Sequence, residues 1–175
     1  MLHQQKSIPE PLRRIVDSIL SKFRLTIGNI TQDQECEAYS GVNFQLNERT
    51  VKFRKAKITP KKTGQFVTLW KRNSNGQTEP FSITEPIDFY IIAVERDQNL
   101  GFFLFPKAVL AEKRILTENG KEGKRGFRVY PAWDIPENKQ AEKTKSWQIS
   151  FFIDLSSNEK TPEEAFKNLF FDNME

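Results

Sequence analysis

The sequence predicts an α/β fold in which a mixed β-sheet is flanked by helices on both faces. Three observations support this: residues 9–24 place apolar side chains at helical spacing, residues 42–105 contain several short strand-like runs, and further helical segments follow. Neighbouring strands that precede helices favour one sheet covered by helices. With 175 residues, the chain fits one domain spanning residues 1–175.

The first half of the chain is predicted to hold one helix and three strands. The amphipathic pattern of residues 9–24 predicts a helix whose apolar side packs into the core. Residues 42–46 alternate between apolar and polar side chains, as do residues 51–53, and residues 47–49 between them are typical of a hairpin turn. Residues 65–72 predict the third strand.

The second half of the chain is predicted to alternate between strands and helices. Its last helix starts at Thr161, followed three residues later by Glu164, which is the spacing of a capping box. The predicted elements are a central strand over 86–94, a strand over 101–105, a helix over 106–116, a short strand over 127–133, and helices over 134–148 and 161–171.

The composition excludes several kinds of catalytic and metal site. His3 is the only histidine and Cys36 the only cysteine, so a histidine-activated nucleophile or a zinc site of about four His and Cys ligands has too few residues. Cys36 is expected to be a packed thiol, and no cofactor is expected. A single cysteine forms no intrachain disulfide, which favours the cytoplasm. No apolar run is long enough for a transmembrane helix, so no membrane partner is expected.

Positive charge is concentrated in two segments. Residues 49–72 hold nine Lys or Arg residues and no acidic residue, while residues 113–128 hold six basic and two acidic residues. The net charge of the whole chain is only +4, so the rest of the chain is net negative. This distribution predicts a positive face that attracts polyanions.

Five sequence blocks occur in order within about residues 35–150: FRKAKITPKKTGQFVTLWKR, PIDFYII, FPKAVL, GKRGFRVYPAWD and KQAEKTKSWQ. Together they resemble the motifs of the bacterial MepB-like family. The resemblance implies a restriction-endonuclease-like fold of the PD-(D/E)XK superfamily, and it implies nucleic-acid binding. The family takes its name from a gene beside a multidrug-efflux pump, which suggests a link to drug-response operons.

The superfamily resemblance can be tested against the demands of nuclease chemistry. Two carboxylates would hold Mg²⁺, and the second would lie two residues before a lysine that helps to position the nucleophile. If that lysine is Lys55, the carboxylate position is Phe53. If it is Lys57, the position is Lys55 itself, and if it is Lys71, the position is Leu69. No register supplies an acid, so no catalytic residue and no metal ligand are assigned.

Two alternatives stay open. In the first, the chain is a metal-dependent nuclease whose acids are displaced, with Glu37 and Asp88 as the candidates. Asp88 is otherwise expected to cap or pair at the start of its strand. In the second, the basic segments bind a partner protein or a small anion.

The main hypothesis is a nucleic-acid-binding protein that prefers RNA or single-stranded DNA. Lys and Arg neutralise phosphates without reading the sequence, and rings among them stack on unpaired bases. Lys55 and Lys57 are expected to occupy the former catalytic centre. Glycines on both sides of Lys124 and Arg125 are expected to let main-chain amides approach a phosphate. The candidate binding residues are Arg54, Lys55, Lys57, Lys61, Lys62, Trp70, Lys71, Arg72, Lys124, Arg125, Arg128, Tyr130 and Trp133.

Overall fold

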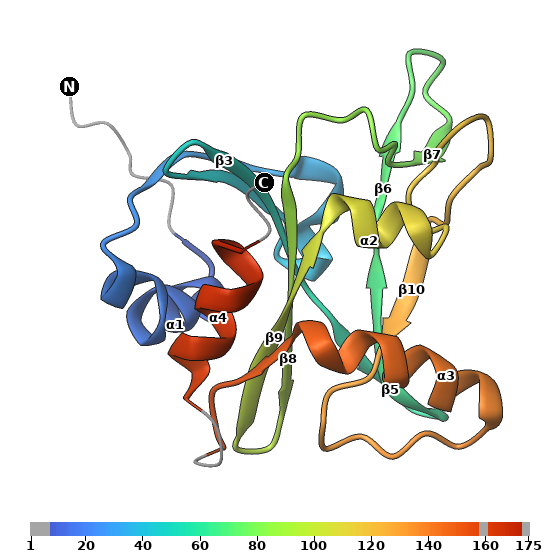
Figure 1. The fold of residues 1–175 in the computed structure, drawn as a ribbon. Helices are drawn as coiled ribbons and strands as arrows, with labels where there is room; N and C mark the ends of the chain where they lie inside the picture. Colours follow the sequence, from blue (N-terminus) through green and yellow to red (C-terminus); the bar gives the residue numbers. More distant parts are fainter. Residues whose placement is uncertain (1–7, 158–160, 173–175) are drawn as a thin grey trace.

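The computed structural model describes residues 8–157 and 161–172, so the single histidine, His3, lies outside the described residues. Its centre is a six-stranded mixed sheet (Figure 1). All neighbouring strands are antiparallel except β3 and β8, which are parallel. The mixed α/β class predicted from the sequence is confirmed. From one edge to the other, the strands are β1 (Ile27–Gln32), β2 (Val42–Leu46), β3 (Arg49–Lys55), β8 (Phe89–Arg96), β9 (Asn99–Pro106) and β11 (Phe152–Asp154).

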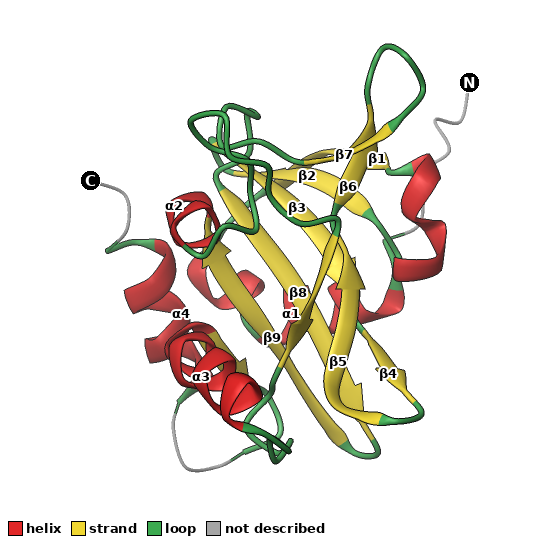
Figure 2. Cartoon of the chain, turned by 90° about the vertical axis from the view of Figure 1, so that its right-hand side faces the viewer, coloured by secondary structure: helices red, strands yellow, loops and turns green. Residues whose placement is uncertain are grey.

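Two smaller sheets are built from the segments that connect these strands. A three-stranded antiparallel sheet has the order β10-β5-β4, and a two-stranded sheet pairs β6 with β7. These two sheets form a second layer beside the six-stranded sheet, and Figure 2 views the molecule from the side of that layer. The strands are β4 (Lys57–Thr59), β5 (Lys62–Thr68), β6 (Trp70–Arg72), β7 (Thr78–Pro80) and β10 (Gly126–Val129).

Helices lie on both sides of the six-stranded sheet. On one side are α1 (Glu10–Ser18), the 3₁₀ turn η1 (Leu20–Phe23) and α4 (Pro162–Phe170), and on the other are α2 (Lys107–Glu112) and α3 (Lys139–Gln148) (Figure 1). Two short 3₁₀ segments, η2 (Gln34–Tyr39) and η3 (Ile149–Phe151), complete the secondary structure of the described residues.

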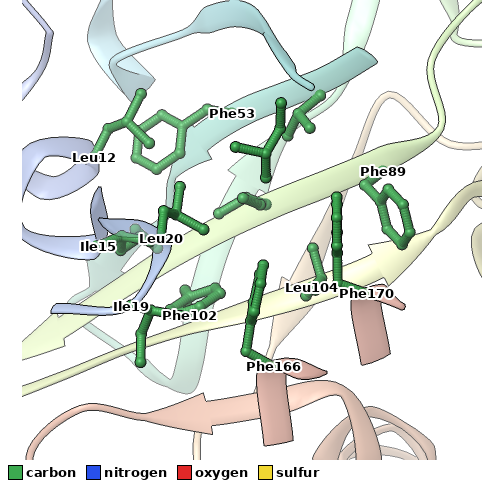
Figure 3. Packing of buried hydrophobic residues seen from close by; sticks show 14 of the residues in the cluster. Leu12, Ile15, Ile19, Leu20, Phe53, Phe89, Phe102, Leu104, Phe166 and Phe170 are labelled. Carbon is green, nitrogen blue, oxygen red and sulfur yellow. The ribbon is translucent and has the colours of Figure 1, made fainter. Parts of the chain in front are cut away.

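Each side of the sheet has its own buried cluster, because strand side chains alternate between the two faces. On the α1 side, Leu12 and Ile15 pack with Phe53, Phe102 and Phe166 (Figure 3). The cluster on the other side packs α2 and the strands β5 and β10 against β8 and β9. The three-stranded sheet therefore has a buried face toward β8 and an outer face.

Several predicted boundaries differ from the structure. The predicted helix over 9–24 ends at Ser18, where Ile19 leaves helical geometry, and continues only as η1. The predicted strand over 65–72 is divided at Leu69, whose main-chain N–H bonds to the Arg125 carbonyl instead of to a strand partner. The short strands β1, β4, β7 and β11 were not predicted, and β1 is irregular in register because Asn29 has a φ of 51°.

The predicted capping box at the start of α4 is wrong. The Thr161 side chain makes no capping hydrogen bond, and the main-chain carbonyl of Thr161 accepts from the Glu164 N–H at 3.2 Å. The first turn of α4 is therefore closed by the main chain alone.

Asn138, in contrast, caps α3 with its side chain, which accepts a hydrogen bond from the Ala141 N–H at 2.9 Å. Loss of such a cap costs about 1 kcal/mol, so Asn138→Ala is expected to lower the free energy of unfolding by that amount in urea denaturation followed by circular dichroism. Thr161→Ala is the matched control, because it removes a hydroxyl from an N-cap position where no side-chain bond exists. The control should change stability by less than about 0.5 kcal/mol, and equal losses in both variants would contradict the assignment.

Candidate polyanion-binding pocket

The two basic segments of the sequence meet in one pocket of about 880 Å³. Its walls are the turn between β4 and β5, the strand β10, the helix α3 and the chain that follows α2. We call this the basic pocket. Its charged lining consists of six basic side chains and one acidic side chain: Lys61, Lys62, Lys113, Lys124, Arg128, Lys143 and Glu137.

The basic pocket is held together by strand pairing and by one buried amide. β5 and β10 are antiparallel, with Gln65 opposite Val129, so the start of β5 lies beside the end of β10. The fully buried Gln148 of α3 accepts from the Tyr130 N–H at 2.8 Å and donates to the Arg128 carbonyl at 2.8 Å. Both ends of this one side chain fix α3 against β10.

Arg128 lines the basic pocket, and among the described residues no carboxylate pairs with it. Its guanidinium donates to the Thr59 hydroxyl at 2.6 Å and to the Thr63 carbonyl at 3.3 Å, both of which are neutral acceptors. The adjacent Gly64 has a φ of +74°, and a Cβ there would lie 2.7 Å from the Tyr130 ring. A side chain at position 64 would therefore clash with the Tyr130 ring, which lines the pocket.

Most lysines of the basic pocket also have free charge. Lys61, Lys62, Lys124 and Lys143 are exposed, and within the described part of the chain none of them forms an ion pair. Lys113 lies 3.3 Å from the exposed carboxylate of Glu112. The pocket therefore presents concentrated positive charge, which is the arrangement expected for a site that accepts phosphates.

Arg54 is a candidate that the structure removes from the binding surface. Its side chain is fully buried, with Nη2 2.5 Å from the Asp33 carboxylate and Nη1 donating to the Phe53 carbonyl at 2.9 Å. The second layer of the fold covers this face of β3, so the charge at position 54 is internal. Arg54 was expected at a binding surface, but in the structure its side chain is not exposed there.

Arg54 belongs to a buried charge cluster with Lys52 and Asp33. The Lys52 ammonium donates to the Asn43 side chain at 2.6 Å and lies 3.4 Å from the Asp33 carboxylate. Burial, reinforced by the neighbouring Arg54 charge, lowers the pKa of Lys52 to about 8. Burial alone would raise the pKa of Asp33, but the attraction of Arg54 and Lys52 outweighs it and lowers that pKa.

Lys55 and Lys57 were expected to lie together in the former catalytic centre, but the structure gives them different surroundings. The strand is interrupted at Ala56, so Lys55 ends β3 and Lys57 starts β4 in a different sheet. The Lys55 ammonium donates to the Glu95 carboxylate at 3.0 Å, and the Lys57 ammonium lies 4.6 Å from the Tyr39 ring centroid. Neither residue lines the basic pocket.

Three further basic candidates are paired with acids outside the basic pocket. Lys71 contacts Glu85 and lies 3.6 Å from a second carboxylate, that of Glu79. The Arg72 guanidinium donates to Glu35 at 2.9 Å. Arg125 lies 3.0 Å from the Glu122 carboxylate and also donates to the Thr78 carbonyl.

In the glycine-flanked loop, the amides of Gly123 and Lys124 are already bonded within the protein and do not face a ligand. The Gly123 N–H donates to the Thr117 hydroxyl at 2.9 Å, and the Lys124 N–H donates to the Ile115 carbonyl at 2.9 Å. The loop therefore contributes the Lys124 side chain to the basic pocket, while these two amides hold the loop in place.

Of the three aromatic candidates, only Tyr130 lies in the lining of the basic pocket. Burial raises the pKa of Tyr130. Trp70 lies elsewhere, with the Arg72 guanidinium 5.4 Å from its ring centroid, and Trp133 packs edge-on against Phe152 at 5.5 Å. Residues that were not candidates also line the pocket, among them Lys113, Gln140, Lys143 and Trp147.

The two acids of the alternative metal site lie toward opposite ends of β3. Asp88 accepts from the Thr50 N–H at 2.9 Å near the start of β3. Glu37 lines a second pocket of about 360 Å³ together with Val42, which pairs with Phe53 near the end of β3. Within residues 8–157 and 161–172, no group of three or more His, Cys, Asp or Glu side chains could hold a metal ion.

Comparisons with known proteins identify the family. The family described as MepB-like matches residues 33–154. A solved structure described as "Crystal Structure of MepB" is 36% identical, superimposes with a TM-score of 0.73, and is matched over 75% of this chain and 89% of that chain. A search of the curated proteins gave no match. No helix of the described residues could span a membrane. The chain belongs to the MepB-like family.

Proposed function

We propose that this protein binds nucleic acid, preferably RNA or single-stranded DNA, in the basic pocket and does not cut it. The observation that carries the proposal is the convergence of six cations with one acid in a single pocket that also contains aromatic side chains. Lys and Arg neutralise backbone phosphates without reading the base sequence. The separation of Glu37 from Asp88 gives the nuclease alternative no support.

We also propose that the six-stranded sheet is of the restriction-endonuclease-like kind. Support comes from the antiparallel hairpin of β2 and β3, followed by the parallel pairing of β3 with β8. In this arrangement β3 carries Phe53 and Lys55 where a nuclease would need a carboxylate and a lysine. A binding protein that keeps the fold without the metal site agrees with that pattern.

The proposal is tested with two triple variants that change the net charge equally. The first replaces Lys62, Lys124 and Lys143 of the basic pocket by serine. The second replaces Lys55, Lys71 and Arg72 by serine; these three are basic candidates from the sequence that the structure places on carboxylates outside the pocket. Affinity is measured by fluorescence anisotropy with labelled single-stranded RNA, single-stranded DNA and duplex over a series of salt concentrations.

The pocket variant is expected to bind single strands about tenfold more weakly than the parent at one salt concentration. Its slope of log affinity against log salt should fall by about two, because each lost phosphate contact on a single strand contributes about 0.7. The control variant should change little. Equal losses in both variants, or an affinity that does not depend on salt, would contradict the proposal.

Two further arms separate the alternatives. Mononucleotides that compete as well as oligonucleotides would indicate a small-anion binder. Incubation of the oligonucleotides with Mg²⁺ or Mn²⁺, with an EDTA control, is expected to leave them intact. Cleavage that disappears in Glu37→Ala or Asp88→Ala would instead establish the nuclease.

A further inference from the structure

Trp147 is the tryptophan that the fold brings to the basic pocket. Of the three tryptophans in the chain, Trp70 lies beside the Arg72 guanidinium and Trp133 packs on Phe152, and neither lines the pocket. Trp147 is half-buried and lies in the pocket wall. Phe127 and Tyr130 also line the pocket but are only 8% and 7% exposed, so the indole is the most exposed aromatic surface there.

The position of Trp147 on α3 places it within a polar stripe. Gln140, Lys143, Thr144 and Trp147 are separated by three, four and seven residues, so they lie on one side of the helix, and all four line the basic pocket. Over about 10 Å of helix, this stripe offers an amide, an ammonium, a hydroxyl and an aromatic ring. A nucleotide requires the same set: phosphate neutralisation, hydrogen bonds and a stacking surface.

The Trp147 ring is held in place before any ligand binds. On the core side it packs against Phe105, with ring centroids 5.6 Å apart and planes inclined at 47°. On the pocket side the Lys113 ammonium lies 5.6 Å from the indole centroid. The core contact holds the ring itself in place, so only the flexible Lys113 side chain has to move aside for a base to stack. Its ammonium can then meet the phosphate attached to that base.

We propose that Trp147 is the base-stacking platform of the basic pocket, so that the ligand enters as an unpaired base with its phosphates on the surrounding lysines. This inference rests on the proposed function and specifies it further. Every base has a flat face, so stacking is tolerant of sequence, while a duplex conceals those faces between its neighbouring pairs. The pocket is thus expected to prefer single strands for a structural reason beyond charge.

The test compares Trp147→Leu with Trp147→Phe and with Trp70→Leu as the matched control. Each protein is titrated with a single-stranded oligouridylate and, separately, with inorganic polyphosphate, which carries the charge but has no bases. Trp147→Leu is expected to bind the oligonucleotide about tenfold more weakly and polyphosphate as well as the parent does. Trp147→Phe should recover most of the affinity, and Trp70→Leu should lose none.

A second measurement keeps the test independent of the stability of Trp147→Leu. In a protein carrying Trp70→Phe and Trp133→Phe, the fluorescence of Trp147 should be quenched by the oligonucleotide but not by polyphosphate. Absence of this quenching, or an unchanged oligonucleotide affinity in Trp147→Leu, would overturn the stacking role while leaving nucleic-acid binding intact. If the parent itself shows no salt-dependent binding of oligonucleotides, the proposed function fails first.

Discussion

Asp33→Ala is expected to lower the free energy of unfolding by about 3–5 kcal/mol, because it removes the carboxylate that faces two buried cations. Arg54 is fully buried and the Lys52 side chain is 6% exposed, and both contact the same oxygen of Asp33. Without that oxygen the two positive charges would repel each other with little water to screen them. Urea denaturation at neutral pH measures the loss.

Two comparisons separate this effect from a general loss of charge. Glu79→Ala removes a half-exposed carboxylate, 3.6 Å from Lys71, and is expected to change stability by less than about 1 kcal/mol. Arg54→Met should be less damaging than Asp33→Ala, because Asp33 then still pairs with Lys52. If Arg54 contributed mainly through packing, Arg54→Met would instead lose more stability than Asp33→Ala.

The second large effect is a dependence of stability on pH that originates at Lys52. Its folded pKa is about 8, and the ordinary value is 10.5. Between these values the unfolded chain holds the Lys52 proton while the folded chain has released it, so raising the pH favours the folded state. The contribution is absent below about pH 8 and is complete above about pH 10.5, with a size of about 3 kcal/mol.

Lys52→Met isolates this contribution from the other groups that titrate at high pH. The difference in the free energy of unfolding between the parent and Lys52→Met is expected to shift in favour of the parent as the pH rises from 8 to 10.5. Chemical denaturation at four or five pH values measures this difference. A constant difference across the range would show that Lys52 titrates in the folded protein as it does in the unfolded chain.

Four of the six strands of the central sheet, β2, β3, β8 and β9, were predictable because their signals are local. Alternation over 42–46 and 51–53 identified β2 and β3, and the apolar run over 86–94 identified the buried strand β8. Alternation also shows which side chains share a face of a strand. It does not show whether that face meets solvent or a second layer, and for this reason Arg54 was wrongly assigned to the surface.

The lining of the basic pocket was only partly predictable, because ion pairing depends on residues distant in the sequence. Lys71 and Arg72 look as free as Lys61 and Lys62 in the sequence, but the first two meet Glu85 and Glu35 through the fold. The contribution of α3 had one detectable signal, the spacing of three, four and seven residues from Gln140 to Trp147. That spacing alone cannot tell a pocket wall from a core stripe.

All residues that line the basic pocket belong to two connections between strands of the central sheet. One connection runs from β3 to β8 and the other from β9 to β11. The sheet and the helices α1 and α4 contribute no side chain to the pocket lining. Because connecting segments tolerate substitution and changes of length better than a packed sheet does, the pocket lining can change while the central sheet is retained. In evolutionary terms, the cluster that packs the sheet against α1 and α4 and the lining of the basic pocket are carried by separate parts of the chain.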